Sequence, residues 1–177
     1  MTGLRAALTA MARHAIAERL GQAGPALPPS TLPGEPRGVF VTLRRRADDG
    51  LRGCVGIVEA RFPLGEAVRR AAVSAALEDK RFPPVTLREL PALTCDVSVL
   101  GPLSPSAPEA VEVGRHGVVV RHDERSALFL PQVATEQGWD RETLLRQLCR
   151  KAGLSPDAWR HPECRLFVFE TETYTED

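Results

Sequence analysis

Two alternating apolar segments flank the turn sequence Ala-Asp-Asp-Gly at residues 47–50, and this arrangement predicts a β-hairpin. Residues 39–45 and 51–58 both follow the two-residue period of a β-strand, in which successive side chains point to opposite faces. Aspartate and glycine are favoured in the tight turns that join antiparallel strands. We therefore expect strands 39–45 and 51–58 to pair with each other across this turn.

The second predicted strand contains the run Leu-Arg-Gly-Cys-Val-Gly at residues 51–56. Glycine contributes no packing inside a strand, so two glycines beside a cysteine suggest a bulge, or a place where another group approaches the backbone closely. Regular alternation would divide the side chains of this strand between two faces. The core face would then carry Leu51, Val55 and Ile57, and the opposite face would carry Arg52, Cys54 and Gly56.

A guanidinium and a thiol on one face make Cys54 and Arg52 candidate catalytic residues. A neighbouring cation favours the thiolate, which is the reactive form of cysteine. Gly53 and Gly56 could expose backbone N–H groups to an anion, and Arg52 could pair with a carboxylate or a phosphate. The alternative is a buried cysteine in a tightly packed sheet with Arg52 at the surface, because free cysteine is among the most buried residue types. Both interpretations stay open at this point.

Several segments of the chain, in order, are similar to the motifs of one known family. Residues 51–56 resemble its signature Leu-Arg-Gly-Cys-Ile-Gly, with valine in place of isoleucine. The family is the AMMECR domain family, whose prokaryotic members are called AmmeMemoRadiSam system protein A. Further matches are Gly-Val-Phe-Val-Thr at 38–42, Asp-Lys-Arg-Phe-Pro-Pro-Val at 79–85, Val-Ser-Val-Leu at 97–100, Leu-Pro-Gln-Val-Ala at 130–134, Trp139, and Lys-Ala-Gly-Leu at 151–154.

The order of the predicted elements favours an α+β fold with an antiparallel sheet flanked by helices. Hairpins and helices follow one another without the periodicity of repeated strand–helix–strand units. Apolar residues at helical spacing predict helices over residues 4–20 and 64–75, and Asp140 is a suitable N-cap for a third helix that stops at Gly153.

The resemblance implies the same fold class and adds a domain organisation. Residues 1–177 would form a single AMMECR-type domain with two intimate subdomains. The larger would be built from both chain ends and the smaller from the middle, roughly residues 60–108. The resemblance further implies a cleft between them that the cysteine motif faces.

Four further residues are candidates for lining this cleft. Asp79 and Arg81 match motif positions of the family, although a helix end with an exposed cation would explain them equally well. His116 lies in a glycine-bounded turn at 114–117 and could serve Cys54 as a base, although histidines in turns are more often plain surface residues. His122 is a second option for that base. Gln132 would either line the cleft or only start a helix.

The cysteine spacing predicts no structural metal. The cysteines stand at positions 54, 95, 149 and 164, without a Cys-x-x-Cys pair or a paired His-x-x-x-His. Cys95 and Cys149 lie on apolar faces and are expected to be inert core thiols. No glycine-rich phosphate loop, dinucleotide fingerprint or hydrolase elbow appears, so the sequence predicts no cofactor.

The composition argues against two classes of partner. Lys+Arg and Asp+Glu both number 23, whereas general nucleic-acid binders usually carry a basic excess. No stretch reaches the ~18 apolar residues of a membrane span. The first 20 residues repeat like a helix and carry charges, which is unlike a signal peptide. We expect a cytoplasmic protein with reduced thiols and no membrane partner.

Three functions remain in competition. The first is a component that binds a small-molecule ligand or a partner, in a modification or redox pathway that the resemblance associates with Memo-type and radical-SAM proteins. The second is an enzyme that uses Cys54 in the cleft. The third is a nucleic-acid-linked regulatory protein, which the neutral charge and the single tyrosine make less favourable. Whether the protein is an enzyme is left open by the sequence.

Overall fold

The computed structural model describes residues 2–24 and 32–176, and the chain divides into two compact units. The first unit contains residues up to Leu100 together with those from Glu172 onward, and the second unit is Gly101–Thr171. The predicted smaller subdomain at roughly 60–108 differs from this division. Residues 60–100 belong to the first unit, because the helix and the strand in this segment pack against the N-terminal hairpin.

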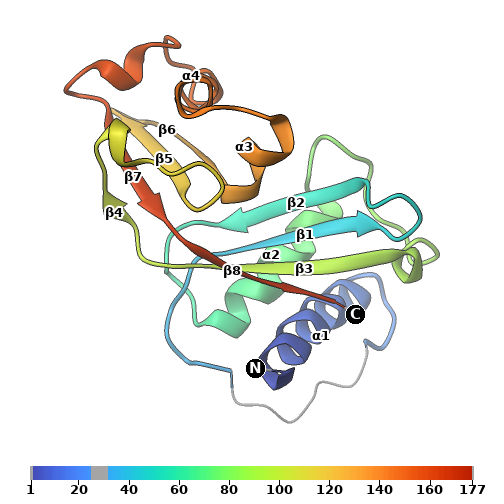
Figure 1. Cartoon of the computed structure of the whole chain (residues 1–177). Coiled ribbons are helices and arrows are strands. Elements are labelled where there is room, and N and C mark those ends of the chain that lie inside the picture. The colour runs from blue at the N-terminus through green and yellow to red at the C-terminus, as the bar shows by residue number, and fades with distance from the viewer. Residues whose placement is uncertain (1, 25–31, 177) are drawn as a thin grey trace. The chain divides into compact units, whose positions relative to one another are not determined.

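The first unit is a four-stranded sheet with two helices packed on it (Figure 1). The strand order is β2-β1-β3-β8, and β1 pairs antiparallel with both of its neighbours. The predicted hairpin of residues 39–45 and 51–58 is therefore confirmed. The elements are α1 (Thr2–Arg19), β1 (Val39–Arg45), β2 (Leu51–Ile57), α2 (Leu64–Leu77), a 3-10 turn (Leu90–Ala92), β3 (Leu93–Leu100) and β8 (Thr171–Thr175).

The hydrophobic core of this unit lies between the sheet and its helices. Alternation along β1 sends Val39, Val41 and Leu43 into the core, where all three are fully buried. The buried face of α2 is rich in alanine, so the helix can approach the backbone of β2 closely. None of the helices in the described parts of the chain combines the length and apolar character needed to span a lipid bilayer.

The second unit is a separate four-stranded sheet with its own core. Its strand order is β4-β7-β5-β6, and the pairs β4–β7, β5–β7 and β5–β6 are antiparallel. The α+β class is as predicted, but the strands form two sheets. The elements are β4 (Ser104–Pro105), a 3-10 turn (Pro108–Ala110), β5 (Gly117–His122), β6 (Arg125–Phe129), α3 (Pro131–Gln137), α4 (Arg141–Lys151), a 3-10 turn (Ala158–Arg160) and β7 (Arg165–Phe169).

A β-bulge interrupts the ladder at the start of β2. Gly53 lies opposite Leu43, but Leu51 lies opposite Arg44. Arg52 is therefore an extra residue in β2 that has no opposite residue on β1. The predicted faces therefore need a correction. Leu51 shares the face of Arg44 and not the core face, because directly paired residues point to the same side. Regular alternation holds from Gly53 onward, and Val55 packs against the core as expected.

Candidate functional site

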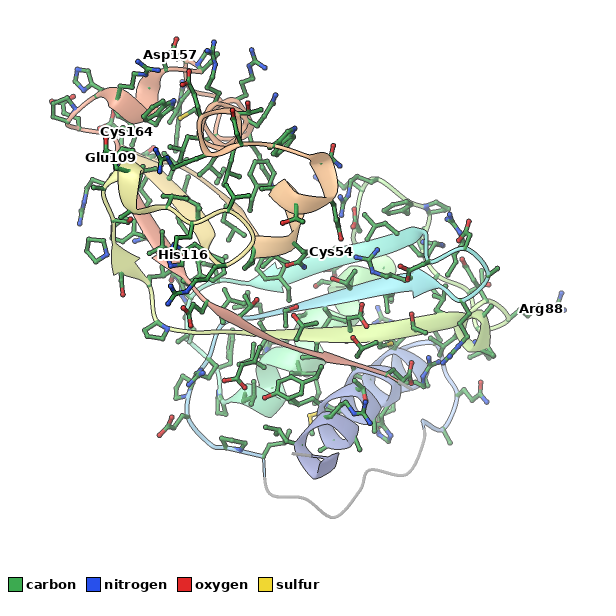
Figure 2. All side chains as sticks on the ribbon, viewed as in Figure 1. Cys54, Arg88, Glu109, His116, Asp157 and Cys164 are labelled. Carbon is green, nitrogen blue, oxygen red and sulfur yellow. The ribbon has the colours of Figure 1, made fainter. Side chains whose placement is uncertain are left out.

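Cys54 lies on the edge strand of the first sheet, on the face turned away from the helices (Figure 2). Its partner on β1 is Thr42, whose hydroxyl donates a hydrogen bond to the thiol sulfur at 3.3 Å. Cys54 is half-buried, whereas Thr42 is only 6% exposed. The thiol is thus held by a hydroxyl donor from the neighbouring strand and remains partly accessible.

Asp79 and Arg81 bind the backbone of Cys54 from the open side of β2. The Asp79 carboxylate accepts the N–H of Cys54 at 2.9 Å, and the Arg81 guanidinium donates to the carbonyl oxygen of Cys54 at 3.3 Å. The two side chains also hold each other, because Arg81 donates from Nε and Nη2 to the two oxygens of Asp79 at 2.9 and 2.7 Å. The structure thus brings Asp79 and Arg81 together with Cys54.

This arrangement keeps the carboxyl group of Asp79 ionised. The Arg81 guanidinium is the largest influence, and the backbone N–H groups of Cys54 and Arg81 add to it, so the pKa of Asp79 lies well below its usual range despite burial. The pKa of Arg81 is raised in turn, by Asp79 first and, to a smaller extent, by the electrostatic influence of Cys54. Arg81 is therefore the guanidinium that can support a thiolate at this site.

Arg52 has a different environment from the one predicted for it. Its guanidinium forms a two-pronged ion pair with Glu89 at 2.5 and 3.1 Å and donates to the carbonyl oxygen of Pro83 at 3.0 Å. It also lies over the ring of Phe82, and the residue is only 7% exposed. The bulge removes Arg52 from the alternation that was expected to set it beside the thiol. Arg52 anchors the segment that follows α2 to the base of β2.

The two glycines beside Cys54 have steric explanations. A Cβ at Gly53 would collide with the carbonyl oxygen of Ala75 on α2, and a Cβ at Gly56 would enter the ring of Phe40 on β1. Glycine at 53 thus lets the helix backbone touch the strand, and glycine at 56 leaves room for an aromatic ring. The suggestion that a group approaches the backbone closely is confirmed at both positions.

His116 and Gln132 belong to the second unit. The Nδ1 atom of His116 accepts the backbone N–H of Glu112 at 3.1 Å, which fixes the ring within its own turn. Gln132 is the second residue of α3. His122 lies at the end of β5, with Nδ1 3.4 Å from the carboxylate of Asp123. Their part in a cleft with Cys54 stays a prediction.

The sequence interpretation missed a row of polar residues on the same face as Cys54. Thr42 on β1 lies opposite both Cys54 on β2 and Asp96 on β3, so these three residues stand side by side across three strands. One step along the sheet, the hydroxyls of Ser98 and Thr173 are 2.9 Å apart. The signal was present, because alternation within 39–45 and 95–100 already separates these polar side chains from the valines.

The other three cysteines are buried thiols. Burial raises the pKa of Cys95 to about 12 and that of Cys149 to about 11, and it also raises the pKa of Cys164. All three side chains belong to the hydrophobic cores, so they have little access to solvent. Across residues 2–24 and 32–176, no group of three or more histidine, cysteine or acidic side chains is arranged to hold a metal ion.

Comparison with known proteins decides the family. The AMMECR1 family model matches residues 9–174, which is nearly the whole chain. The chain belongs to the AMMECR1 family. A protein of Methanopyrus kandleri is 45% identical over 180 residues, covering 96% of this chain and 87% of that protein. A protein of Thermococcus gammatolerans is 44% identical over 182 residues, covering 96% and 89%.

A solved structure shows the same AMMECR1 architecture. The crystal structure of an uncharacterised protein from Pyrococcus horikoshii matches with a TM-score of 0.87 at 41% sequence identity. The match covers 96% of this chain and 90% of that chain. The names of these relatives assign no activity to them.

Proposed function

We propose that this AMMECR1-family protein is a cytoplasmic binding component of a modification or redox pathway, and that it binds its ligand or partner at Cys54. The observation that carries the proposal is that two side chains fix the backbone of Cys54. Asp79 accepts a hydrogen bond from its N–H, and Arg81 donates one to its carbonyl oxygen. A binding group held in one geometry loses little entropy when its ligand arrives. The resemblance to the AmmeMemoRadiSam system suggests Memo-type and radical-SAM proteins as the other components.

The charges around Cys54 favour binding over catalysis. A cysteine nucleophile is normally activated by a base whose pKa lies near the working pH. The carboxylate nearest to the Cys54 backbone is Asp79, and its strongly lowered pKa makes it a poor proton acceptor. The donor to the thiol is the hydroxyl of Thr42, which positions the sulfur without removing its proton. The site is therefore organised to present a thiol in a fixed place.

Protection of the thiol from alkylation tests this function. Iodoacetamide labelling of Cys54 is followed by peptide mass spectrometry, with and without a purified Memo-type or radical-SAM protein from the same organism. We expect one of the two proteins to slow the labelling of Cys54, whereas an equal mass of serum albumin does not. The variant Asp79→Asn should weaken this protection. The proposal is wrong if neither protein binds, or if a complex forms while Cys54 stays as reactive as before.

A cysteine-dependent enzyme is the second candidate, and two observations favour it. The hydrogen bond that the Thr42 hydroxyl donates to the sulfur and the positive charge of Arg81 both stabilise a thiolate relative to a thiol. The pH dependence of Cys54 alkylation separates the two functions. If the alkylation rate is half-maximal at a pH well below ~8.5, the pKa of free cysteine, the result supports a nucleophile. A half-maximal rate at or above that pH supports the binding component.

A further inference from the structure

One acceptor in the polar row on the first sheet, Oδ1 of Asp96, has no hydrogen-bond partner within residues 2–24 and 32–176. Cys54, Thr42 and Asp96 lie directly opposite one another on β2, β1 and β3. Their sequence neighbours Val41, Val55 and Val97 pack with the core on the other face. The row therefore belongs to the face of the sheet that carries the thiol, and it extends the candidate site inward from the edge.

The two carboxyl oxygens of Asp96 differ in their surroundings. Oδ2 lies 3.5 Å from Nε of Arg44, and the hydroxyl of Thr175 also hydrogen-bonds to the carboxyl group. Oδ1 is buried and has no hydrogen-bond partner among the described residues. A buried polar atom without a partner costs about 1–3 kcal/mol, so its retention needs an explanation. Burial also raises the pKa of Asp96.

Thr42 cannot supply the missing donor while it serves the thiol. A hydroxyl has one proton, and that of Thr42 is directed to the sulfur of Cys54. On its Asp96 side the hydroxyl therefore offers only lone pairs. An ionised Asp96 also offers only lone pairs. One group that carries several N–H donors can satisfy both of these neighbouring acceptors.

We propose that the row Cys54–Thr42–Asp96 binds the primary ammonium group of a small ligand, seated over Thr42 between the thiol and the Asp96 carboxylate. An ammonium has three donors, enough for Oδ1 of Asp96 and the hydroxyl oxygen of Thr42. Because Thr42 is only 6% exposed, the group that reaches it must be slender. This inference rests on the proposed binding role of Cys54 and names the chemistry of the ligand.

Charged thiol reagents test the proposal, because they deliver a chosen group to Cys54. Adjacent strands lie about 4.8 Å apart, so a two-carbon chain on the sulfur can carry an ammonium over Thr42 toward Asp96. The probes are 2-aminoethyl methanethiosulfonate, its trimethylammonium analogue and its sulfonate analogue. The trimethylammonium reagent keeps the charge and lacks N–H donors. Labelling rates of Cys54 are mapped by mass spectrometry and divided by the rates with glutathione.

We expect the aminoethyl reagent to label Cys54 about tenfold faster than the trimethylammonium reagent, which corresponds to one charge-assisted hydrogen bond. The variant Asp96→Asn should remove most of this preference. Thr42→Val should also reduce it, and it serves as the second variant if Asp96→Asn does not fold. The control Asp48→Asn makes the same charge change at the hairpin turn, where Asp48 pairs with Arg45, and should keep the preference.

The outcomes separate this inference from the proposed function. Equal normalised rates for the three reagents, or a preference that Asp96→Asn leaves intact, would overturn the ammonium site while an accessible Cys54 still stands. A thiol that none of the reagents labels in the folded protein would overturn both. If a Memo-type protein protects Cys54 and acetylation of its lysines abolishes that protection, the ammonium comes from a partner lysine, and the small-ligand assignment is wrong.

Discussion

Asp79 accepts a hydrogen bond from the backbone N–H of Cys54 at 2.9 Å, so a residue just beyond α2 closes the open edge of β2 at the thiol. Arg81 donates a hydrogen bond to the backbone carbonyl oxygen of Cys54. An exposed strand edge is a template for pairing with another strand. By occupying both groups, Asp79 and Arg81 prevent that pairing at Cys54 and leave the side chain as the part of this residue that a ligand can contact.

The variant Asp79→Asn should lower the free energy of unfolding by about 1–3 kcal/mol at pH 7, because it removes charge-assisted hydrogen bonds to Cys54 and Arg81. The difference from wild type should depend on pH. Asp79 has a lowered pKa in the folded protein, so its stabilisation is present above about pH 4 and is lost as the pH falls through the folded-state pKa. Urea unfolding between pH 2.5 and 7 measures the effect.

A matched control for Asp79→Asn is Glu66→Gln. Glu66 pairs with Arg70 on the exposed surface of α2, so its loss should cost at most about 0.5 kcal/mol. Equal losses for the two variants would contradict a specific role of Asp79 at β2.

Arg52 and Arg81 should have separable effects on stability and on thiol chemistry. Replacing Arg52 with methionine should lower the free energy of unfolding by about 2 kcal/mol, because the Glu89 carboxylate and the Pro83 carbonyl lose their donor. The alkylation rate of Cys54 should hardly change. Arg81→Met should instead slow alkylation of Cys54 several-fold at neutral pH, because it removes the cation that favours the thiolate.

Thermal melts and iodoacetamide kinetics on both variants check this separation. The result that would refute it is slower alkylation in Arg52→Met together with an unchanged melting temperature. Arg52 would then act on the thiol, and the Glu89 ion pair would be unimportant for folding.

The variant Gly53→Ala should be destabilised by about 2 kcal/mol, because the new methyl group meets the carbonyl oxygen of Ala75 and α2 must move. This exceeds the ~0.4–1 kcal/mol that alanine gains by restricting the unfolded chain. Gly3→Ala is the control, since Gly3 lies in α1 with open space around it and alanine favours helix. Its stability should rise by up to about 1 kcal/mol. A Gly53→Ala protein as stable as wild type would show that α2 does not press on β2.

Native protein should expose one reactive thiol and unfolded protein four. Cys54 is half-buried, whereas Cys95, Cys149 and Cys164 are buried and have raised pKa values. The raised pKa of Cys95, about 12, also predicts alkaline sensitivity. The stabilisation from burying the neutral Cys95 thiol is complete below about pH 8.5, the pKa of the thiol in the unfolded chain. It is lost as the pH rises toward 12, the pKa in the folded protein. Thiol counting by mass spectrometry, and unfolding at pH 8 and 10, measure both effects; early labelling of Cys95 would contradict its burial.

Local sequence patterns were sufficient to predict the hairpin that carries Cys54 and the start of helix α4 in the second unit. Alternation around the Asp-Asp-Gly turn predicted the β1–β2 pair, and Asp140 forms the predicted N-cap of α4 by accepting the N–H of Thr143. These features depend on residues close together in the chain. The glycines of β2 also indicated a close backbone approach, which the carbonyl of Ala75 provides.

The partners of the site residues depended on contacts that sequence spacing does not reveal. One bulged residue was enough to change the surroundings of Arg52, because a shift of one position in a strand exchanges its faces. Its partner Glu89 lies 37 residues away. Asp96 was missed because its importance comes from its register with Thr42 and from the missing partner of one oxygen. The division of the chain likewise depends on which strands join which sheet.

The division into two units also sets the order in which the chain can be assembled during synthesis. The second unit is one continuous segment, Gly101–Thr171, whereas the first needs β8 and Glu176 as well as the first hundred residues. Glu176 binds Arg13 of α1 at 2.6 Å and accepts the N–H of Cys95 at 3.1 Å. On the ribosome, the later segment can therefore finish folding first, while the sheet that carries Cys54 waits for its fourth strand.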